Sequence, residues 1–192
     1  FGMHEEVELI HRNQVYGAET RVFDLVIYDG VTPESEVAGK AIFIKTVPSF
    51  LETKDDKKTG LFEVSQWEQG YPLLQFVNLN SLKITEFLPV LSPPQGKVIA
   101  ETAQGPLIIA GEQENFQWLY LSFAFQNSTF PLQVGFPVFL DNVVRWFFPQ
   151  VFKPNFSWVK AGEKFKYRPR GDKKVQEVLF EEKELTLNQE FS

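Results

Sequence analysis

The chain has 192 residues, of which 43% are hydrophobic and 15% aromatic, and this composition excludes a disordered protein. The formal net charge of −6 argues against a general nucleic-acid binder. Because the chain contains no cysteine, a disulfide framework, a thiolate metal site and a cysteine nucleophile are also excluded.

The first part of the chain predicts strands of a parallel sheet. Three apolar runs are bounded by turn residues, namely "EEVELIH" (5–11), "FDLVIYDG" (23–30) and "KAIFIKT" (40–46). Such continuous runs are typical of strands that are buried on both faces of a sheet covered by helices. The segment 52–60, "ETKDDKKTG", is instead predicted to be a charged, mobile loop.

The pattern changes near residue 80, where short apolar runs alternate with polar turns. Strands are predicted at 81–88, 96–103, 105–112 and 116–125, with hairpin connections at "AQGP" and "GEQEN". The run 116–125 alternates least, so it is expected to be the more central strand. These strands predict a β-rich insertion in an α/β domain.

The stretch 130–148 is mostly apolar and is long enough to raise the question of a membrane span. Asp141 and Arg145 would each cost about 2.5–3.5 kcal/mol at mid-membrane, which favours a soluble helix. Pro137 suits the first helical position and Pro149 ends the helix. Because the polar residues occupy one narrow face, the helix 137–148 is expected to pack on several sides.

Residues 1–150 are therefore predicted to form the main domain, and 151–192 a small C-terminal β appendage. The appendage reads as two or three strands with a turn at "PRGDKK" (169–174), and it either packs on the first domain or begins a truncated β-domain. The basic and aromatic segment 160–174 has three interpretations: a solvated strand face, a contact with anionic lipid, or a site for single-stranded nucleic acid. The acidic residues that follow favour the first.

No sequence motif for a cofactor, a metal or a catalytic residue is present. The chain lacks G-x-G spacing, a phosphate-binding loop, G-x-S-x-G and H-E-x-x-H, and it has two histidines, His4 and His11. Asp29 and Gly30 follow a predicted parallel strand, where open α/β sheets bind ligands. The alternative is that Asp29 caps a turn and that Gly30 supplies a positive φ.

Four pieces of the chain, in order, resemble a known family. They are "FDLVIYDGVTPE", "WEQGYPLLQFVNLNSLKI", "GPLIIAGE…FQWLYLSFAF" and "STFPLQVGFPVFLDNVVRW". They resemble the region that follows the von Willebrand factor A domain in bacterial aerotolerance-type (Bat-like) membrane proteins. The matching positions are Asp29, Gly30, Pro33, Pro72, Leu73, Leu74, Gly105, Pro106, Leu107, Phe136, Pro137, Asn142, Arg145 and Trp146.

The resemblance implies a flavodoxin-like (class I glutamine amidotransferase-like) sheet in a non-catalytic version. It also implies a membrane-anchored parent protein with a soluble domain on the extracytoplasmic, periplasmic side. The chain departs from the family at Tyr71, where the family has His, and at Ala124 and Thr129, where acidic residues are expected. The upstream A domain and its metal motif are absent from this sequence.

The expected function is a structural or protein-interaction module that binds a partner protein or a neighbouring domain, with no cofactor and no nucleic acid. The alternative is a small-ligand sensor or hydrolase that uses the strand ends near Asp29. The discriminating feature is whether the candidate site residues Asp29, Gly30, Tyr71, Gln126 and Asn142 converge on one pocket.

Overall fold

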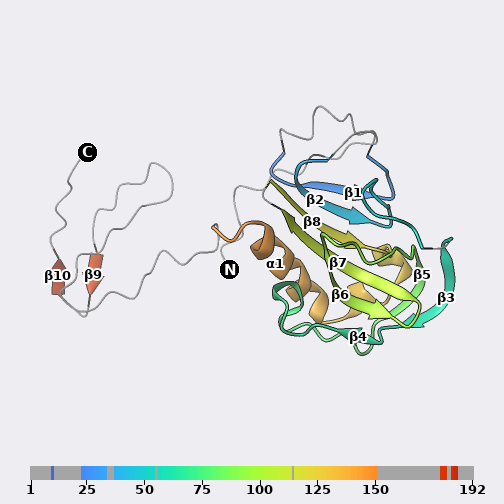
Figure 1. The fold of residues 1–192 in the computed structure, drawn as a ribbon. Helices are drawn as coiled ribbons and strands as arrows, with labels where there is room; N and C mark the ends of the chain where they lie inside the picture. The colour runs from blue at the N-terminus through green and yellow to red at the C-terminus, as the bar shows by residue number, and fades with distance from the viewer. Residues whose placement is uncertain are drawn as a thin grey trace. The chain divides into compact units, whose positions relative to one another are not determined.

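The computed structural model describes residues 10, 23–33, 37–54, 56–113, 115–150, 178–180 and 183–185. The chain divides into two compact units, Phe1–Pro149 and Gln150–Ser192. The first is a mixed α/β unit with a mostly β sheet and one α-helix among its described residues (Figure 1). In the second, β9 (Val178–Phe180) pairs with β10 (Lys183–Leu185) as an antiparallel hairpin.

The main sheet of the first unit has six strands in the order β1-β2-β8-β7-β6-β4. Their bounds are β1 Val26–Asp29, β2 Gly39–Ile44, β8 Phe116–Leu121, β7 Gly105–Gln113, β6 Lys97–Thr102 and β4 Gln66–Trp67. β1, β2 and β8 are parallel, whereas β7, β6 and β4 continue the sheet with antiparallel pairings. The carboxyl ends of three parallel strands therefore meet at one edge of the sheet.

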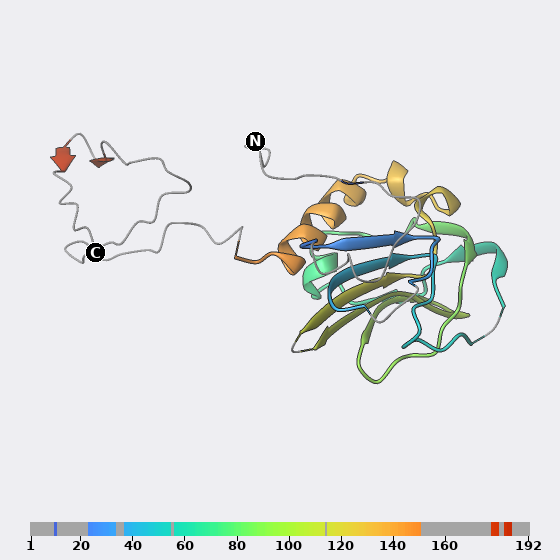
Figure 2. The same cartoon turned by 90° about the horizontal axis from the view of Figure 1, so that it is seen from above.

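The two faces of the sheet are covered differently. On one face, α1 (Gly135–Phe147) buries Phe139, Val143 and Phe147 against strand residues that include Leu119 and Leu121. The view in Figure 2 shows α1 lying along this face. On the other face, Phe43, Trp118 and Tyr120 are buried under loop residues Phe50, Leu51 and Val90. A helix covers one face and loops cover the other.

The sequence predicted the position of α1 correctly, but it predicted the packing of the helix wrongly. The helix begins at Gly135, two residues before Pro137, and ends at Phe147. It does not pack on several sides, because Leu140 and Val144 on its outer face remain 41% and 40% exposed. The apolar composition of the helix reflects one buried face together with apolar residues that the described part of the fold leaves in solvent.

Most strand predictions are confirmed in type, and several differ in position. β2 and β8 are inner strands, and both predicted hairpins are present. Among the described strands, β1 lies at the edge of the sheet, and Ile27 is 51% exposed, so the expectation of burial on both faces is wrong for it. The strand predicted at 5–11 and the turn at 169–174 lie outside the described residues.

The run 81–88 forms β5 (Lys83–Phe87), which leaves the main sheet. β5 pairs with β3 (Lys58–Glu63) in a separate two-stranded sheet, and β3 begins inside the segment predicted as a loop. Phe62 of β3 packs edge-on against Phe87, with ring centroids 4.9 Å apart. This aromatic contact stabilises β3. The sequence did not predict β3, because its first residues belong to the charged segment 52–60.

Candidate interaction surface

Asp29 and Gly30 lie at the carboxyl end of β1, as the sequence predicts. Asp29 is exposed, and Gly30 adopts a φ of +67° while its N–H donates to the Ile44 carbonyl at 2.9 Å. This left-handed conformation suits glycine because no Cβ obstructs it. Gly30 therefore turns the chain at the end of β1.

The ends of the other two parallel strands are closed. Thr46 and Ser122 follow β2 and β8 and are 4% and 0% exposed, and the Thr46 hydroxyl lies 3.2 Å from that of Thr32. Beside them, Glu86 on β5 lies 2.5 Å from the Lys45 ammonium and 3.0 Å from the Lys57 ammonium. This end of the sheet therefore carries two buried hydroxyl residues and an ion-pair cluster around Glu86.

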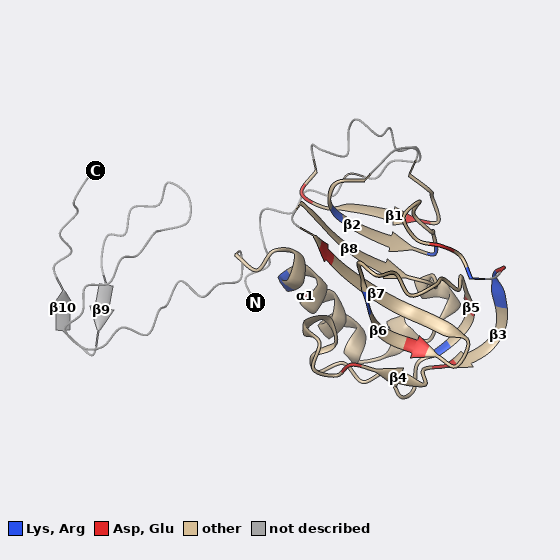
Figure 3. Cartoon of the chain, in the orientation of Figure 1, with Lys and Arg blue, Asp and Glu red and all other residues tan. Residues whose placement is uncertain are grey.

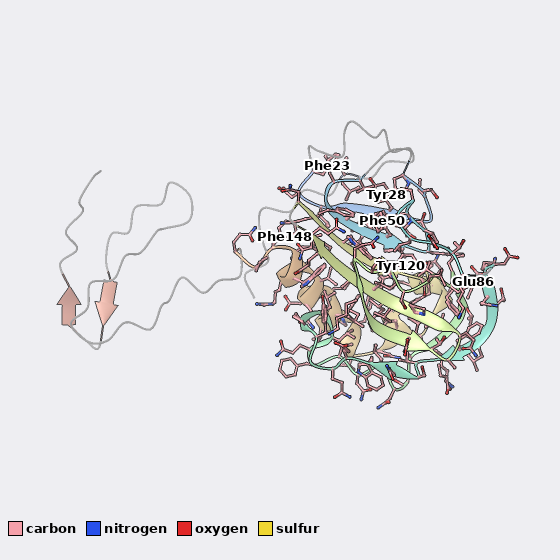
Figure 4. All side chains as sticks on the ribbon, viewed as in Figure 1. Phe23, Tyr28, Phe50, Glu86, Tyr120 and Phe148 are labelled. Atoms are coloured by element: carbon pink, nitrogen blue, oxygen red, sulfur yellow. The ribbon has the colours of Figure 1, made fainter. Side chains whose placement is uncertain are left out.

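The Lys45 side chain reaches Glu86 from a φ of 50°, which is unusual for a residue that carries a Cβ. The hydrogen bonds from Lys45 and Lys57 lower the pKa of the Glu86 carboxyl below its usual range. Figure 4 labels Glu86 on the side of the small β3–β5 sheet and Tyr120 on the main sheet. The cluster joins the small β3–β5 sheet to the end of the main sheet.

Tyr71 and Asn142 share one neighbourhood. Tyr71 precedes η2 (Pro72–Leu74), a 3-10 turn, and its ring lies 5.5 Å from the Lys97 ammonium. Asn142 projects from α1 and donates to the carbonyls of Leu73 at 3.3 Å and Gln75 at 2.8 Å. Asn142 therefore ties the η2 turn to α1.

Burial raises the pKa of Tyr71, and the nearby carboxylates Glu112 and Glu68 raise it further. Gln126 is exposed on η3 (Phe125–Asn127), another 3-10 turn, which packs next to β5.

The five candidate residues line neither of two open hollows in the described part of the chain. An open hollow of about 560 Å³ is lined by Thr53, Lys54, Asp56, Lys57 and Leu88. A second, of about 390 Å³, is lined by Gly39, Lys40, Glu112, Gln113, Asn115, Phe116 and Gln117. Neither contains Asp29, Gly30, Tyr71, Gln126 or Asn142. Within the described ranges, no three acidic or histidine side chains gather as metal ligands would.

The structure instead brings together two stretches of chain without charged residues. One runs from Gln69 to Leu82 and includes η2, and the other from Asn115 to Leu140 includes η4 (Phe130–Leu132) and the start of α1. The two meet at Gly135, where a Cβ would lie 3.5 Å from Val77 Cγ1 and 3.7 Å from the Asn78 nitrogen. Both stretches are tan in Figure 3, which colours charged residues red or blue.

Three apolar side chains project from these stretches into solvent. Phe76 is 86% exposed, Leu132 87% and Val134 92%. Exposed neutral side chains accompany them, and we call the set Gln75, Phe76, Asn78, Pro131, Leu132 and Val134 the uncharged surface. Apolar and aromatic residues without charges are the composition of interface cores.

The backbone of Phe76 adopts a strained conformation that its neighbours hold in place. Its φ is 62°, a left-handed conformation that costs a non-glycine residue about 1–2 kcal/mol. The neighbours Leu74 and Val77 are buried, and the Gln75 carbonyl accepts the Asn142 bond, so the turn cannot relax around Phe76. Strained residues kept in place by their surroundings cluster at functional sites.

Comparison with known proteins gives a fold likeness and no family. No protein-family model matches the chain, and no curated protein sequence matches it. A cytoplasmic protein from Salmonella typhimurium superimposes with a TM-score of 0.52 at 9% identity, over 67% of this chain and 73% of its own. A second cytoplasmic protein, from Salmonella typhimurium LT2, gives a TM-score of 0.46 at 13% identity, over 57% of this chain and 55% of its own.

At 9% identity, the first likeness concerns the fold alone and supports a mixed α/β architecture. The prediction of a membrane-anchored parent with a periplasmic domain is wrong. The similar structure with a TM-score of 0.52 belongs to a protein described as cytoplasmic. Among the residues that the structure describes, no helix is long and apolar enough to cross a membrane.

The sequence carried part of the signal for the uncharged surface. The two charge-free stretches can be read directly from it, in a chain where 23% of residues are charged. That they meet, and that Phe76 stands out from the turn, depends on contacts between residues far apart in the chain. No sequence pattern marks the left-handed conformation of Phe76.

Proposed function

We propose that this chain is a non-catalytic protein-interaction module that docks a partner protein through the uncharged surface. The single observation that carries the proposal is the nearly complete exposure of Phe76, Leu132 and Val134 within two charge-free stretches. Apolar side chains grouped in this way mark interaction sites, whereas single exposed ones need no explanation.

We further propose that the first unit is a reduced flavodoxin-like, amidotransferase-like domain related to the region after the A domain of aerotolerance-type proteins. Three neighbouring parallel strands, with Asp29 and Gly30 at the end of β1, support this relationship. The loop-covered second face is a departure, since doubly wound sheets carry helices on both faces.

The ligand-sensor or hydrolase alternative has less support. It requires Asp29, Tyr71, Gln126 and Asn142 to converge, yet Asn142 is engaged with the carbonyls of the η2 turn and Gln126 lies on η3. The basic segment 160–174, which raised the nucleic-acid and lipid interpretations, lies outside the described residues. We therefore keep the protein-interaction function as the conclusion.

The test is site-specific photo-crosslinking in the full chain. A benzophenone analogue of phenylalanine at position 76 keeps the aromatic ring and reacts with any protein bound there. Position 61 is the matched control, because Leu61 is 66% exposed on β3, outside the uncharged surface. An adduct containing a protein, formed at 76 and not at 61, supports the proposal. Equal labelling at both positions, or none at 76, refutes it.

A further inference from the structure

We propose that the hollow beside the Lys45–Glu86–Lys57 ion-pair cluster binds a small dissolved oxyanion, such as a phosphate group. This hollow has a volume of about 560 Å³ and is lined by Thr53, Lys54, Asp56, Lys57 and Leu88. It shares no residue with the uncharged surface, so the proposal does not rest on the proposed function. Asp29 does not line it either, so the site differs from the strand end that the sequence indicated.

The ion-pair cluster carries one positive charge in excess. The ammonium groups of Lys45 and Lys57 lie 2.5 and 3.0 Å from the two carboxylate oxygens of Glu86. Two cations therefore share one anion and repel one another, although the whole chain has a formal net charge of −6. The formal charges of Lys54 and Asp56, which also line the hollow, cancel. A bound oxyanion would offset the excess charge.

Hydrogen-bond donors for an oxyanion are present at the same place. A lysine ammonium has three N–H donors, and the bond from Lys57 to Glu86 uses one of them. Thr53, which lines the hollow, carries a hydroxyl that can also donate. Charge-assisted bonds of this kind are the strong ones in anion recognition.

The backbone at Lys45 is the second observation that points to a site. Lys45 directly follows β2, and its N–H donates to the Leu121 carbonyl at 2.9 Å while its φ is 50°. Among the described residues, Phe76 is the one other non-glycine residue with a positive φ. Such strained residues cluster at functional sites, and so do carboxyl groups whose pKa is shifted, as that of Glu86 is.

The walls of the hollow are fixed before any ligand binds. The Leu88 N–H donates to the Ser122 carbonyl at 2.8 Å, and the Leu88 carbonyl accepts the Tyr120 hydroxyl at 2.9 Å. Opposite, the Lys54 N–H donates to the Pro89 carbonyl at 3.0 Å. A hollow held by main-chain bonds at the carboxyl end of parallel strands is where α/β sheets bind small ligands.

The charge of the chain selects a dissolved anion over a lipid headgroup. With a net charge of −6, the protein is repelled by an anionic bilayer, whose attraction requires clusters of basic residues. A small dissolved ion approaches one local positive group without bringing the rest of the protein against a charged surface.

The test is a titration of the full chain with inorganic phosphate, followed by amide resonances in NMR at pH 7 and constant ionic strength. The resonances of Thr53, Lys57 and Leu88 should shift and saturate, with a Kd of roughly 1–10 mM for a half-exposed site. Those of β6, on the other side of the sheet order, should not move.

Two substitutions should act in opposite directions. Lys57→Gln removes one ammonium group and should weaken phosphate binding at least ~5-fold, whereas Glu86→Gln removes the competing carboxylate and should tighten it at least ~3-fold. Lys97→Gln and Glu68→Gln are the matched controls, because they change the net charge equally at another exposed ion pair, with its groups 2.5 Å apart. Both controls should leave the Kd unchanged.

Saturable shifts with these opposite effects support the site. Shifts that do not saturate by about 50 mM overturn it, as does a Kd that Lys57→Gln leaves unchanged or that Lys97→Gln weakens equally. Co-sedimentation with vesicles of phosphatidylcholine and phosphatidic acid, lost in Lys57→Gln, would overturn the dissolved ligand in favour of a lipid headgroup. None of these results bears on the crosslinking test at position 76.

Discussion

Trp118 on β8 fills the space that a side chain at Gly111 on β7 would occupy. The two residues are partners in the β7–β8 ladder, and a Cβ at Gly111 would lie 2.2 Å from Trp118 Cε2 and 2.3 Å from Nε1. Trp118 is fully buried, with Phe50 packed against it at a ring-centroid distance of 5.0 Å. The indole therefore cannot move away from a new side chain without displacing its buried neighbours.

Gly111→Ala is expected to destabilise the domain by about 3 kcal/mol, because overpacking forces the indole and its neighbours to move. Urea unfolding followed by tryptophan fluorescence measures the change. Gly70→Ala is the control, since nothing lies within 4 Å of a Cβ there. Equal stabilities of the two variants would contradict the close approach of Trp118 to Gly111.

Tyr120 holds the loop after β5 through its hydroxyl, which donates to the Leu88 carbonyl at 2.9 Å. Tyr120→Phe should lose about 1 kcal/mol of folding free energy, because Leu88 loses its donor. Burial also raises the pKa of Tyr120 above its ordinary value. A group that stays neutral in the folded state contributes stability up to its unfolded pKa, near 10, and this contribution falls as pH rises further.

Alkaline unfolding should therefore start at a higher pH in Tyr120→Phe than its lower stability alone would suggest. Absorbance at the tyrosinate wavelength, followed together with unfolding, checks this. If Tyr120 ionises while the domain is still folded and at the same pH as an exposed tyrosine, the burial argument fails.

Glu86 makes the free energy of unfolding of the domain depend on pH in the acidic range. Its hydrogen bonds from Lys45 and Lys57 lower its folded pKa, so its contribution is present above the unfolded value of about 4.5 and is lost as pH falls below it. Glu86→Gln should flatten the stability curve between about pH 5 and 3. Glu63→Gln, an exposed carboxylate on β3, is the control and should leave the curve unchanged.

Asn142 couples α1 to the turn that carries Phe76. In Asn142→Asp, the carboxylate faces the carbonyls of Leu73 and Gln75 and cannot donate to either, so a loss of about 2 kcal/mol is expected. Asp141→Asn is the control, because it breaks an exposed i, i+4 pair with Arg145 that is worth about 0.3–0.5 kcal/mol.

Amide hydrogen exchange locates the effect of Asn142→Asp. Protection should fall at Leu74 and Val77, whose N–H groups donate to carbonyls within the η2 turn, and not in β8. If exchange in the turn is unchanged while global stability falls, Asn142 acts on the helix alone. The fixed presentation of Phe76 would then need another cause.

The elements that the sequence predicted well are those whose signals are local. The run 40–46 became the inner strand β2, and the hairpins at 103–106 and 111–115 follow from turn residues between neighbouring apolar runs. The helix at Gly135–Phe147 follows from the spacing of its apolar residues and a proline after its end. Each pattern is set by residues within a few positions of one another.

The candidate site was predicted only in part, because its residues were chosen one at a time. Gly30 has the positive φ that the Asp-Gly turn indicated. Asn142 donates to two main-chain carbonyls from a turn far away in sequence. No local sequence pattern specifies which main-chain carbonyls the side-chain amide of a helix residue will bond.

The sequence by itself determined the mixed α/β class, the central position of β8, and the absence of charge from 69–82 and 115–140. Only the tertiary structure decided that β5 pairs with β3 outside the main sheet, and that the two charge-free stretches meet at Val77 and Gly135. The physical reason is the same in both cases. Periodicity and turn chemistry act over a few residues, whereas strand partners and surface composition depend on which distant segments bury one another.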